Sequence, residues 1–423
     1  MKKAGISLIL LSLILSLFTG CSNKEQLPHS EEGVTHLKFW APLSGGDSDY
    51  MKDLVKEFNK ENPDVKVEML TLKAQEYYTK LRISVVSNQS PDIAIVHASR
   101  LAELNHSDMI QNLDGVAPKA GVKWESFNQN ILSATIINNQ HYALPLDTHA
   151  LIMYVNKNVL KEAGILDAKK RLELGQNAED FMKLLQAIKN NSPEGNFPLS
   201  ITSTGDAPFR FWWTLYSQMG GKLLTPDGKK AAFNNPKSKE ALEFMNQLMS
   251  KNLWPKNIRN GGELFTANKA AIHINGVWMT GALEKNKNLE FLALPIPMLY
   301  EKNATWGDSH TFVIPTKKSD SEKKKIASLK FANWIVDHSS LWAKAGHVPS
   351  KTSVLNSKEF RALPYRSQYA DVLDYVSFMP NSDKVTIIND VLKKHFNLLM
   401  NGQSSIEETL NKAEKEVNNI LSE

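Results

Sequence analysis

The residues with the clearest binding chemistry are aromatic side chains that stand next to glycine and carboxylate groups. Trp40 ends a short apolar run just before Gly45 and Gly46, and the chain contains nine tryptophans in all. In Trp306-Gly307-Asp308-Ser309-His310, the glycine permits close backbone approach, and Asp308 can accept hydrogen bonds from hydroxyl groups. Aromatic faces and planar polar groups suit a ligand with apolar ring faces and many hydroxyls, as carbohydrates have. The alternatives are a packing role for Trp40 and a simple polar turn at Asp308.

The same segment also invites an enzymatic interpretation. Gly307-Asp308-Ser309 is similar to the nucleophile motif of serine esterases. A catalytic serine needs a base and a group that orients the base, and no Asp-x-x-His partner follows downstream. A glycoside hydrolase needs two carboxylates that flank the scissile bond; the 45 acidic residues leave such a pair open, but no hydrolase motif stands out. We expect the protein not to be an enzyme.

Metal and nucleotide chemistry have less support in the sequence. The 11 histidines are scattered without the spacing of a metal site, and Cys21 is the single cysteine. No glycine-rich phosphate loop is present. We therefore predict no metal and no cofactor.

The first twenty residues have the pattern of a secretory signal. Lys2 and Lys3 form a short basic region, and residues 6–18 are almost wholly apolar but too short to span a bilayer comfortably. The apolar run leads into Phe18-Thr19-Gly20-Cys21, which resembles the lipobox of bacterial lipoproteins, with Phe18 at the place of the usual leucine. In such proteins, cleavage precedes a cysteine that then carries diacylglycerol.

A lipid on Cys21 would also explain why a secreted chain carries one unpaired thiol, since a lone cysteine forms no internal disulfide. We expect residues 1–20 to be a signal peptide, Cys21 to be lipidated and residues 21–35 to be a polar tether. The body would then be held on the extracytoplasmic face of the cell membrane. The alternative is an ordinary signal peptide with a chance cysteine.

Composition favours two domains and gives no support for nucleic-acid binding. The 50 Lys and Arg against 45 Asp and Glu give +5, and removal of Lys2 and Lys3 leaves 48 against 45, or +3. A chain of 423 residues is too long for one ordinary core. No stretch after the N-terminal run is long and apolar enough to cross a membrane. We expect a monomer.

Hydrophobic periodicity in the first hundred residues indicates an α/β protein. Met51, Leu54, Val55 and Phe58 share one face of a predicted helix over residues 50–59. The other elements predicted here are strands at 37–40, 65–70 and 92–96 and a helix at 77–86. Alternating strands and helices predict a mostly parallel sheet with ligands at the strand C-terminal ends, after Trp40 and Val96.

Several segments match one known family in the right order along the chain. They are Ser90-Pro91-Asp92-Ile93-Ala94-Ile95, Ile110-Gln111-Asn112-Leu113-Asp114, Tyr142-Ala143-Leu144-Pro145, Met153-Tyr154-Val155-Asn156-Lys157, Ala163-Gly164-Ile165, Asn234-Asn235-Pro236, the run 268–278, and Gly346-His347-Val348-Pro349-Ser350. Together they resemble the extracellular solute-binding family that includes maltose-binding protein, over nearly the whole mature chain.

The resemblance implies a two-lobe periplasmic-binding-protein-like α/β fold of type II, with a hinge that the chain crosses several times. We expect crossings near Leu146, Phe312 and Lys351. The lobes would comprise 36–146 with 312–350, and 147–311 with 351–423. A ligand would lie in the cleft, and hinge closure would follow from contacts made only in the closed state.

The resemblance also assigns candidate ligand residues. Trp278 aligns with a cleft tryptophan of the family, with a core aromatic as its alternative, and Arg210 aligns with a ligand position. Trp213, close to Arg210, is the better cleft candidate among its aromatic neighbours, or else part of the core. Ser99 and Arg100 align with a polar pair that binds sugar hydroxyls. His97 precedes them, with a satisfied residue at a helix start as its alternative.

Two further candidates, Asp147 and His149, fall at the first crossing. His149 stands where maltose binders usually have an acidic residue, which argues against maltose itself. The prediction is a lipid-anchored binding protein that delivers a carbohydrate, we expect an oligosaccharide, to the permease of an ABC transporter whose ATPase is a separate protein. The alternatives are a surface carbohydrate-degrading enzyme or adhesin, or a binding protein for a polyamine or metal ion. The basic and histidine side chains would also suit an anionic sugar.

Overall fold

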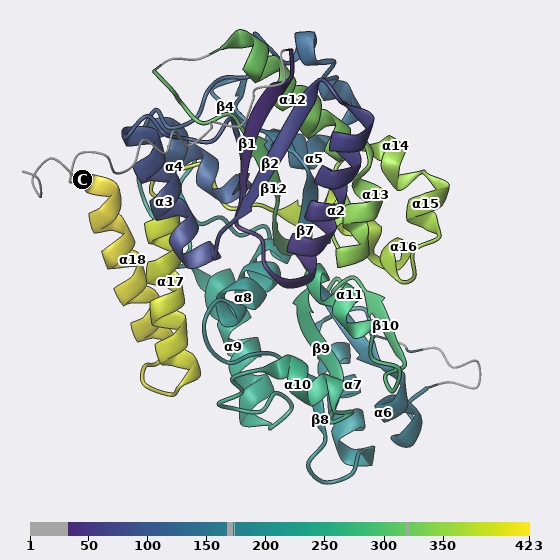
Figure 1. Cartoon of the computed structure of the whole chain (residues 1–423). Helices are drawn as coiled ribbons and strands as arrows, with labels where there is room; N and C mark the ends of the chain where they lie inside the picture. Colours follow the sequence, from purple (N-terminus) through teal and green to yellow (C-terminus); the bar gives the residue numbers. More distant parts are fainter. Residues whose placement is uncertain (1–32, 167–171, 173, 319–320) are drawn as a thin grey trace, which may run out of the picture. The chain divides into compact units, whose positions relative to one another are not determined.

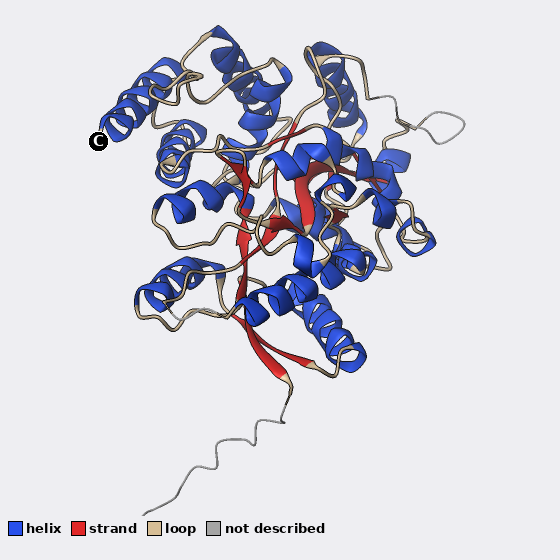
Figure 2. Ribbon diagram, turned by 90° about the horizontal axis from the view of Figure 1, so that it is seen from above, coloured by secondary structure: helices blue, strands red, loops and turns tan. Residues whose placement is uncertain are grey.

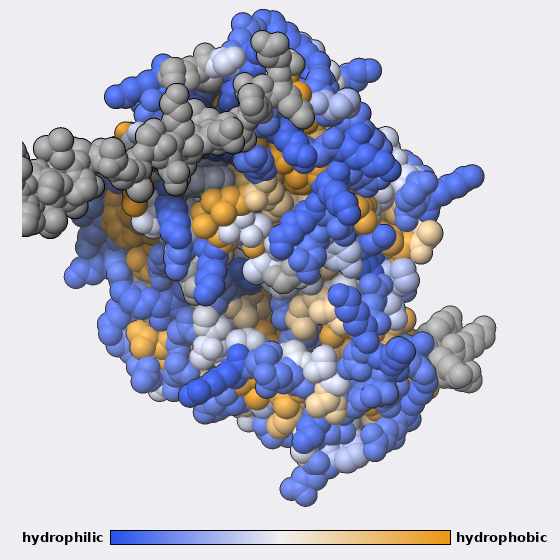
Figure 3. All heavy atoms as spheres, in the orientation of Figure 1, coloured by the Kyte–Doolittle hydropathy of each residue, from blue (hydrophilic) through white to orange (hydrophobic). Residues whose placement is uncertain are grey.

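The computed structural model describes residues 33–166, 172, 174–318 and 321–423, and residues 35–423 form one compact unit. The predicted signal peptide, Cys21 and most of the 21–35 tether lie outside the described residues. No described helix is both long and apolar enough to cross a bilayer. On the face drawn in Figure 3, hydrophilic side chains predominate and apolar ones form small separate groups.

The first sheet has five strands in the order β2-β1-β3-β12-β6. The strands are β2 (Val65–Thr71), β1 (Thr35–Ala41), β3 (Ile93–His97), β12 (His310–Val313) and β6 (Leu144–Pro145). β1 runs parallel to β2 and β3, whereas β12 runs antiparallel to β3 and β6. In β1, Leu37 and Phe39 are buried and Lys38 is exposed, which is the alternation of a half-buried strand.

Helices α2 (Gly45–Glu61), α3 (Ala74–Val86) and α12 (Glu322–Asp337) accompany this sheet. The predicted apolar face of α2 is confirmed, because its four apolar residues are all buried. Phe331 of α12 makes edge contacts with Phe39 and Phe58, at centroid distances of 5.2 and 5.0 Å. These ring contacts fix the two helices on the sheet.

The second sheet is built around β7 (Asp147–Asn156), all of whose residues are buried. Its order is β14-β11-β7-β9-β8, from β14 (Val376–Ser377), β11 (Thr305–Asp308), β9 (Ala270–Gly276) and β8 (Phe197–Ser200), and β10 (Phe291–Leu294) and β13 (Val348–Pro349) also pair with β7. β7 is antiparallel to β9, β10, β11 and β13. The prediction of mostly parallel strands therefore holds for β1 to β3 and is wrong around β7.

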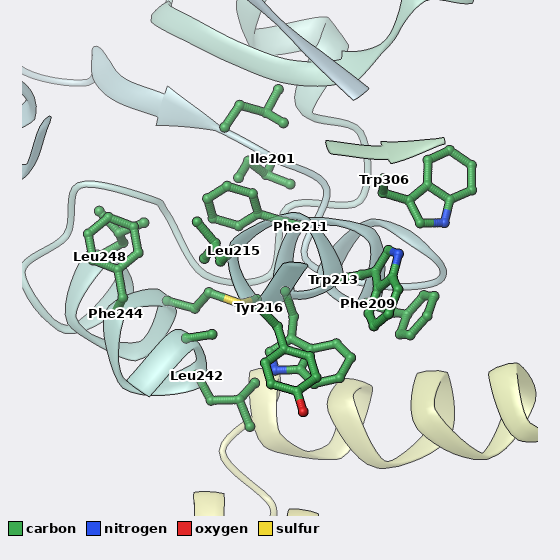
Figure 4. Packing of buried hydrophobic residues seen from close by; sticks show 14 of the residues in the cluster. Ile201, Phe209, Phe211, Trp213, Leu215, Tyr216, Leu242, Phe244, Leu248 and Trp306 are labelled. Carbon is green, nitrogen blue, oxygen red and sulfur yellow. The ribbon is translucent and has the colours of Figure 1, made fainter. Parts of the chain in front are cut away.

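Helices α7 (Ala178–Asn191), α8 (Ala207–Gln218), α9 (Pro236–Ser250), α17 (Val385–Met400) and α18 (Ile406–Ser422) belong to the largest apolar core. Asn235 caps α9 by accepting a hydrogen bond from the Ser238 amide, as an Asn-Pro start predicts. In Figure 4, Phe211 and Leu215 lie on the side of α8 that faces α9. Figure 2 shows helices around the central strands.

The other elements are short. They are η1 (Ala98–Arg100), α4 (Leu101–His106), η2 (Pro118–Ala120), η3 (Trp124–Ser126), α5 (Gln129–Ser133), β4 (Ile136–Ile137), β5 (Gln140–His141), α6 (Lys157–Glu162), α10 (Gly261–Thr266), η4 (Val277–Met279), α11 (Thr280–Leu283), α13 (Ser339–Trp342), η5 (Ala343–Ala345), α14 (Thr352–Leu355), α15 (Lys358–Arg361), α16 (Arg366–Tyr369) and η6 (Ala370–Asp374).

The chain passes between the two sheets at single residues. Leu146 joins β6 of the first sheet to β7 of the second, and Ser309 joins β11 of the second to β12 of the first. A third contact follows β13, where the Ser350 hydroxyl donates to the Pro145 carbonyl oxygen at 2.7 Å. Figure 1 shows β1, β2 and β12 together in one part of the body and β8 and β9 in another. We keep the lobe boundaries as a proposal. Because Phe312 lies within β12 of the first sheet, the second crossing would fall at Ser309 instead.

His273 of β9 is a fully buried histidine that packs away from these crossings. Its Nδ1 lies 2.8 Å from the Ser200 carbonyl oxygen, and its ring packs beside Phe265 at a centroid distance of 5.7 Å. Burial lowers its pKa from 6.5 to about 4. The folded protein therefore holds His273 neutral at pH values where the unfolded chain protonates it.

Protonation of His273 in the unfolded state should weaken the fold as the pH falls. Because the folded-state pKa is below the unfolded value, stability is complete above 6.5 and declines as the pH falls toward 4. Between about pH 7.5 and 5, this residue should account for about 2 kcal/mol of lost unfolding free energy. Urea denaturation at both pH values should show a smaller loss for His273→Gln than for the wild type. His36→Gln, at an exposed histidine, is the control, and equal losses in all three proteins would contradict the assignment.

Candidate ligand-binding site

A cavity of about 610 Å³ lies where strands of the two sheets meet. Its volume is in the range of small-molecule sites. Seven of the ten predicted ligand residues line it, namely His97, Ser99, Arg100, His149, Arg210, Trp278 and Asp308. The structure thus brings together side chains from β3, η1, β7, α8, η4 and β11.

One wall of the cavity is aromatic. Trp278 and Trp306 meet edge to face, with ring centroids 6.4 Å apart and planes at 88°. The Arg210 guanidinium lies 4.1 Å from the Trp306 ring centroid and 5.4 Å from that of Trp278. The Asp206 carboxylate forms an ion pair with the Arg210 guanidinium, with Oδ2 3.0 Å from Nη2. Trp278 stays partly exposed, so its ring remains available to a ligand.

A glycine allows this placement of Trp278. A Cβ atom at Gly276 would come within 2.0 Å of the Trp278 ring. Any larger residue at position 276 would therefore displace the indole from the wall of the cavity.

Polar side chains from η1, β11 and α17 also line the cavity. Asp308 accepts hydrogen bonds from the Ser99 amide at 3.1 Å and from the Ser99 hydroxyl at 2.5 Å. Arg100 donates to the Thr386 hydroxyl at 2.7 Å and lies 4.7 Å from the Tyr78 ring centroid. η1 is thus tied both to β11 and to the start of α17 across the cavity.

Histidines form the floor of the cavity. The rings of His149 and His310 are 4.5 Å apart, and His310 lies 5.0 Å from His97 and 5.2 Å from His347. His97 Nδ1 is 2.6 Å from the Tyr78 hydroxyl oxygen. Burial, reinforced by the charge of His310, lowers the pKa of His97 and of His149. These two rings are therefore neutral at physiological pH.

Asp147 lies directly beneath the floor and is fully buried. Burial alone would raise its pKa, but the charges of His310 and His347 hold the pKa well below the usual value. The Trp342 indole donates to Asp147 at 2.6 Å, and the His310 amide donates at 3.0 Å. Asp147 therefore holds the floor together and does not itself line the cavity.

Trp213 and Trp40, two further predicted ligand residues, do not line this cavity. Trp213 is buried, donates to the Ser377 carbonyl oxygen at 2.8 Å and lies near Phe209 in the core (Figure 4). Trp40 alternates with buried Phe39 along β1, so it points to the other face and packs against a separate apolar cluster.

Other lining residues were not predicted. Trp306, His310 and His347 lie in sequence segments that had already been singled out. Their closeness along the chain to Asp308 and Val348 could have marked them as site candidates. Tyr78 and Thr386 are single polar positions on helices with no local signal. Their roles follow from the tertiary fold alone.

Two sheets joined by short crossing segments, with an aromatic and polar cavity at the junction, define a two-lobe solute-binding protein of the periplasmic type II class. Comparison with known proteins agrees with this class. Residues 43–340, more than half of the 423-residue chain, match the bacterial extracellular solute-binding protein family. The chain belongs to that family.

Individual relatives cover almost the whole chain. The arabinooligosaccharide-binding protein of Bacillus subtilis is 24% identical over 88% of this chain and 85% of its own length. A maltooligosaccharide ABC transporter solute-binding lipoprotein of Streptococcus pneumoniae is 22% identical over 98% and 96% of the two chains.

Solved structures share the fold. An ABC substrate-binding protein of Listeria monocytogenes in complex with cycloalternan has a TM-score of 0.78 at 19% identity, over 92% of this chain and 99% of its own. The cyclic alpha-maltosyl-1,6-maltose binding protein of Arthrobacter globiformis has a TM-score of 0.77 at 22% identity, with the same coverage.

Proposed function

We propose that this protein is the extracellular substrate-binding component of an ABC importer and that it binds an oligosaccharide in the cavity. The observation that carries the proposal is one cavity lined both by the rings of Trp278 and Trp306 and by the polar Ser99–Asp308 pair. The rings offer apolar faces to sugar rings, and the carboxylate and guanidinium fix hydroxyl groups. The relatives named for arabinooligosaccharides and maltooligosaccharides support the same ligand class.

The cavity gives less support to the alternatives. Ser309, the serine of the esterase-like motif, is fully buried and donates its hydroxyl to the His310 carbonyl oxygen at 3.0 Å. That placement leaves it no path to attack a substrate. The charged side chains of the cavity wall have both signs and partly pair with one another, as Asp206 does with Arg210 and Lys393. A polyamine would therefore meet cations as well as carboxylates, whereas a neutral saccharide can bond to both kinds of group.

Replacement of Trp278 should separate ligand binding from folding. We expect Trp278→Ala to weaken binding of maltotriose or an arabinooligosaccharide by tenfold or more, about 1.4 kcal/mol, because stacking and burial are both lost. A thermal-shift screen of the wild type against a saccharide panel first selects the ligand, since a ligand bound only by the native state raises the melting temperature. Calorimetry then compares the variants.

The matched control is Trp124→Ala. Trp124 stacks on His141 with centroids 4.1 Å apart, outside the cavity, so its loss should leave affinity unchanged. A folded Trp278→Ala protein with wild-type affinity would remove Trp278 from the site. The absence of any melting shift across the panel would contradict carbohydrate binding.

We also propose that the mature protein begins at Cys21 and is anchored by lipid to the outer face of the cell membrane, without enzymatic activity. The relative named as a lipoprotein supports this, together with the apolar run that ends at Cys21. A single acyl chain anchors only marginally, so two chains on one cysteine are physically reasonable.

Mass spectrometry of protein purified from its native host tests the anchor. The N-terminal peptide should begin at Cys21 and carry a diacylglyceryl mass, and Cys21→Ala should appear in the medium or remain unprocessed. Mature protein with a free Cys21 thiol would refute the anchor and leave the binding function untouched.

A further inference from the structure

The fold gathers four metal-ligating residues under the cavity. Asp147, His149, His310 and His347 each offer one ligand atom, and these atoms all lie within 4.8 Å of one another. All four side chains are buried. The spacing of histidines along the chain predicted no metal site, because these four residues come from β7, β12 and the turn before β13.

The separations within this cluster suit a tetrahedral ion. Asp147 Oδ1 is 3.2 Å from His149 Nδ1, and Asp147 Oδ2 is 2.8 Å from His310 Nδ1 and 3.5 Å from His347 Nδ1. Tetrahedral zinc with bonds of about 2.0–2.1 Å places its ligand atoms about 3.3 Å apart. The three measured distances bracket that value, although they run to both oxygens of Asp147 and the four ligand atoms spread over up to 4.8 Å, so an ion would draw the side chains together.

Hydrogen bonding within the described residues does not account for His347. Its side chain is only 1% exposed, and neither of its ring nitrogens makes a hydrogen bond there; each lies only at ion-pair distance from a carboxylate, at 3.5 Å for Nδ1 and 3.4 Å for Nε2. A buried polar nitrogen that makes no hydrogen bond costs free energy, and an ion is one explanation for such a group. One of these nitrogens, Nδ1, faces the Asp147 carboxylate.

Neighbouring side chains orient His347 and Asp147 in the way that outer residues orient metal ligands. Trp342 stacks on His347, with centroids 4.7 Å apart and planes at 6°, and its indole also donates to Asp147. His347 Nε2 lies 3.4 Å from the Asp47 carboxylate. A carboxylate on the far nitrogen of a ligating histidine fixes the ring and makes it a stronger ligand.

Gly346 allows the backbone conformation that places His347 in the cluster. Its φ is +125°, and a Cβ atom there would come within 1.9 Å of the Val277 carbonyl oxygen. The tight approach of the 343–347 turn to η4 therefore requires glycine.

We propose that Asp147, His149, His310 and His347 bind a divalent transition metal of the zinc class. Three imidazoles and one carboxylate match the preference of Zn²⁺ for nitrogen and oxygen ligands in a closed tetrahedral site. The ion would link β7, β12 and β13 at the crossings between the two sheets. The metal site shares His149, His310 and His347 with the floor of the cavity, but the proposal does not depend on the identity of the saccharide.

Metal titration of the mature protein, in the absence of saccharide, tests the site. After treatment with EDTA and dialysis, calorimetry with Zn²⁺ should show one ion per chain. Co²⁺ should give the visible absorption bands of a tetrahedral complex, which Zn²⁺ abolishes. His347→Gln should weaken Zn²⁺ binding at least about 100-fold, and Asp47→Asn, which changes a positioning residue, about 10- to 100-fold.

His106→Gln is the matched control, because His106 is 73% exposed and lies outside the cluster. It should bind Zn²⁺ like the wild type. The site would be overturned if the wild type failed to bind one Zn²⁺ per chain or gave an octahedral Co²⁺ spectrum. Either result would leave only a hydrogen-bonded cluster, and neither depends on whether His347→Gln folds. Unchanged binding by folded His347→Gln would overturn it as well.

Discussion

The buried carboxylate of Asp147 is the interaction on which the junction of the two sheets depends. It begins β7 directly after the first crossing, and it contacts His310 directly after the second. Trp342 donates to the same carboxylate, and His347 stands beside it. Removal of one partner from a buried charged pair costs about 3–5 kcal/mol, because the other charge is left uncompensated. Three chain segments are thus tied at one point, and the cavity lies directly above that point.

This arrangement explains how two separately packed sheets can share one ligand site. The aromatic wall comes from α8, η4 and β11, whereas Ser99 and Arg100 come from η1, which directly follows β3 of the first sheet. A ligand that touches both walls is fully removed from water only when the walls approach each other. Hydrogen bonds to its hydroxyls are stronger in that drier medium. We infer that the lobes close by changes in a few backbone torsions near Leu146 and Ser309, and that the ligand supplies the free energy that shifts the population.

Local patterns in the sequence predicted the local elements well. The apolar spacing of α2 carries its own physical cause, and its buried face appears in the structure as expected. The antiparallel pairing of β7 was not predictable in this way, because a strand that is buried along its whole length fits either direction. Trp213 shows the same limit: a tryptophan suits a cleft or a core equally, and only the tertiary packing, with its indole bonded to Ser377 of β14, decides. The histidine cluster joins residues up to 200 positions apart, as Asp147 and His347 show, so no spacing rule applies.

The central claim, that one ligand is held between two lobes that close on it, is tested most directly by small-angle X-ray scattering. The measurement compares the empty protein with the protein saturated by the saccharide that calorimetry shows to bind. We expect a smaller radius of gyration with the saccharide than without it. Trp278→Ala, which should remain largely unbound at the same saccharide concentration, should show no such change. Identical scattering curves for the empty and the saturated wild type would contradict closure of the lobes on the ligand.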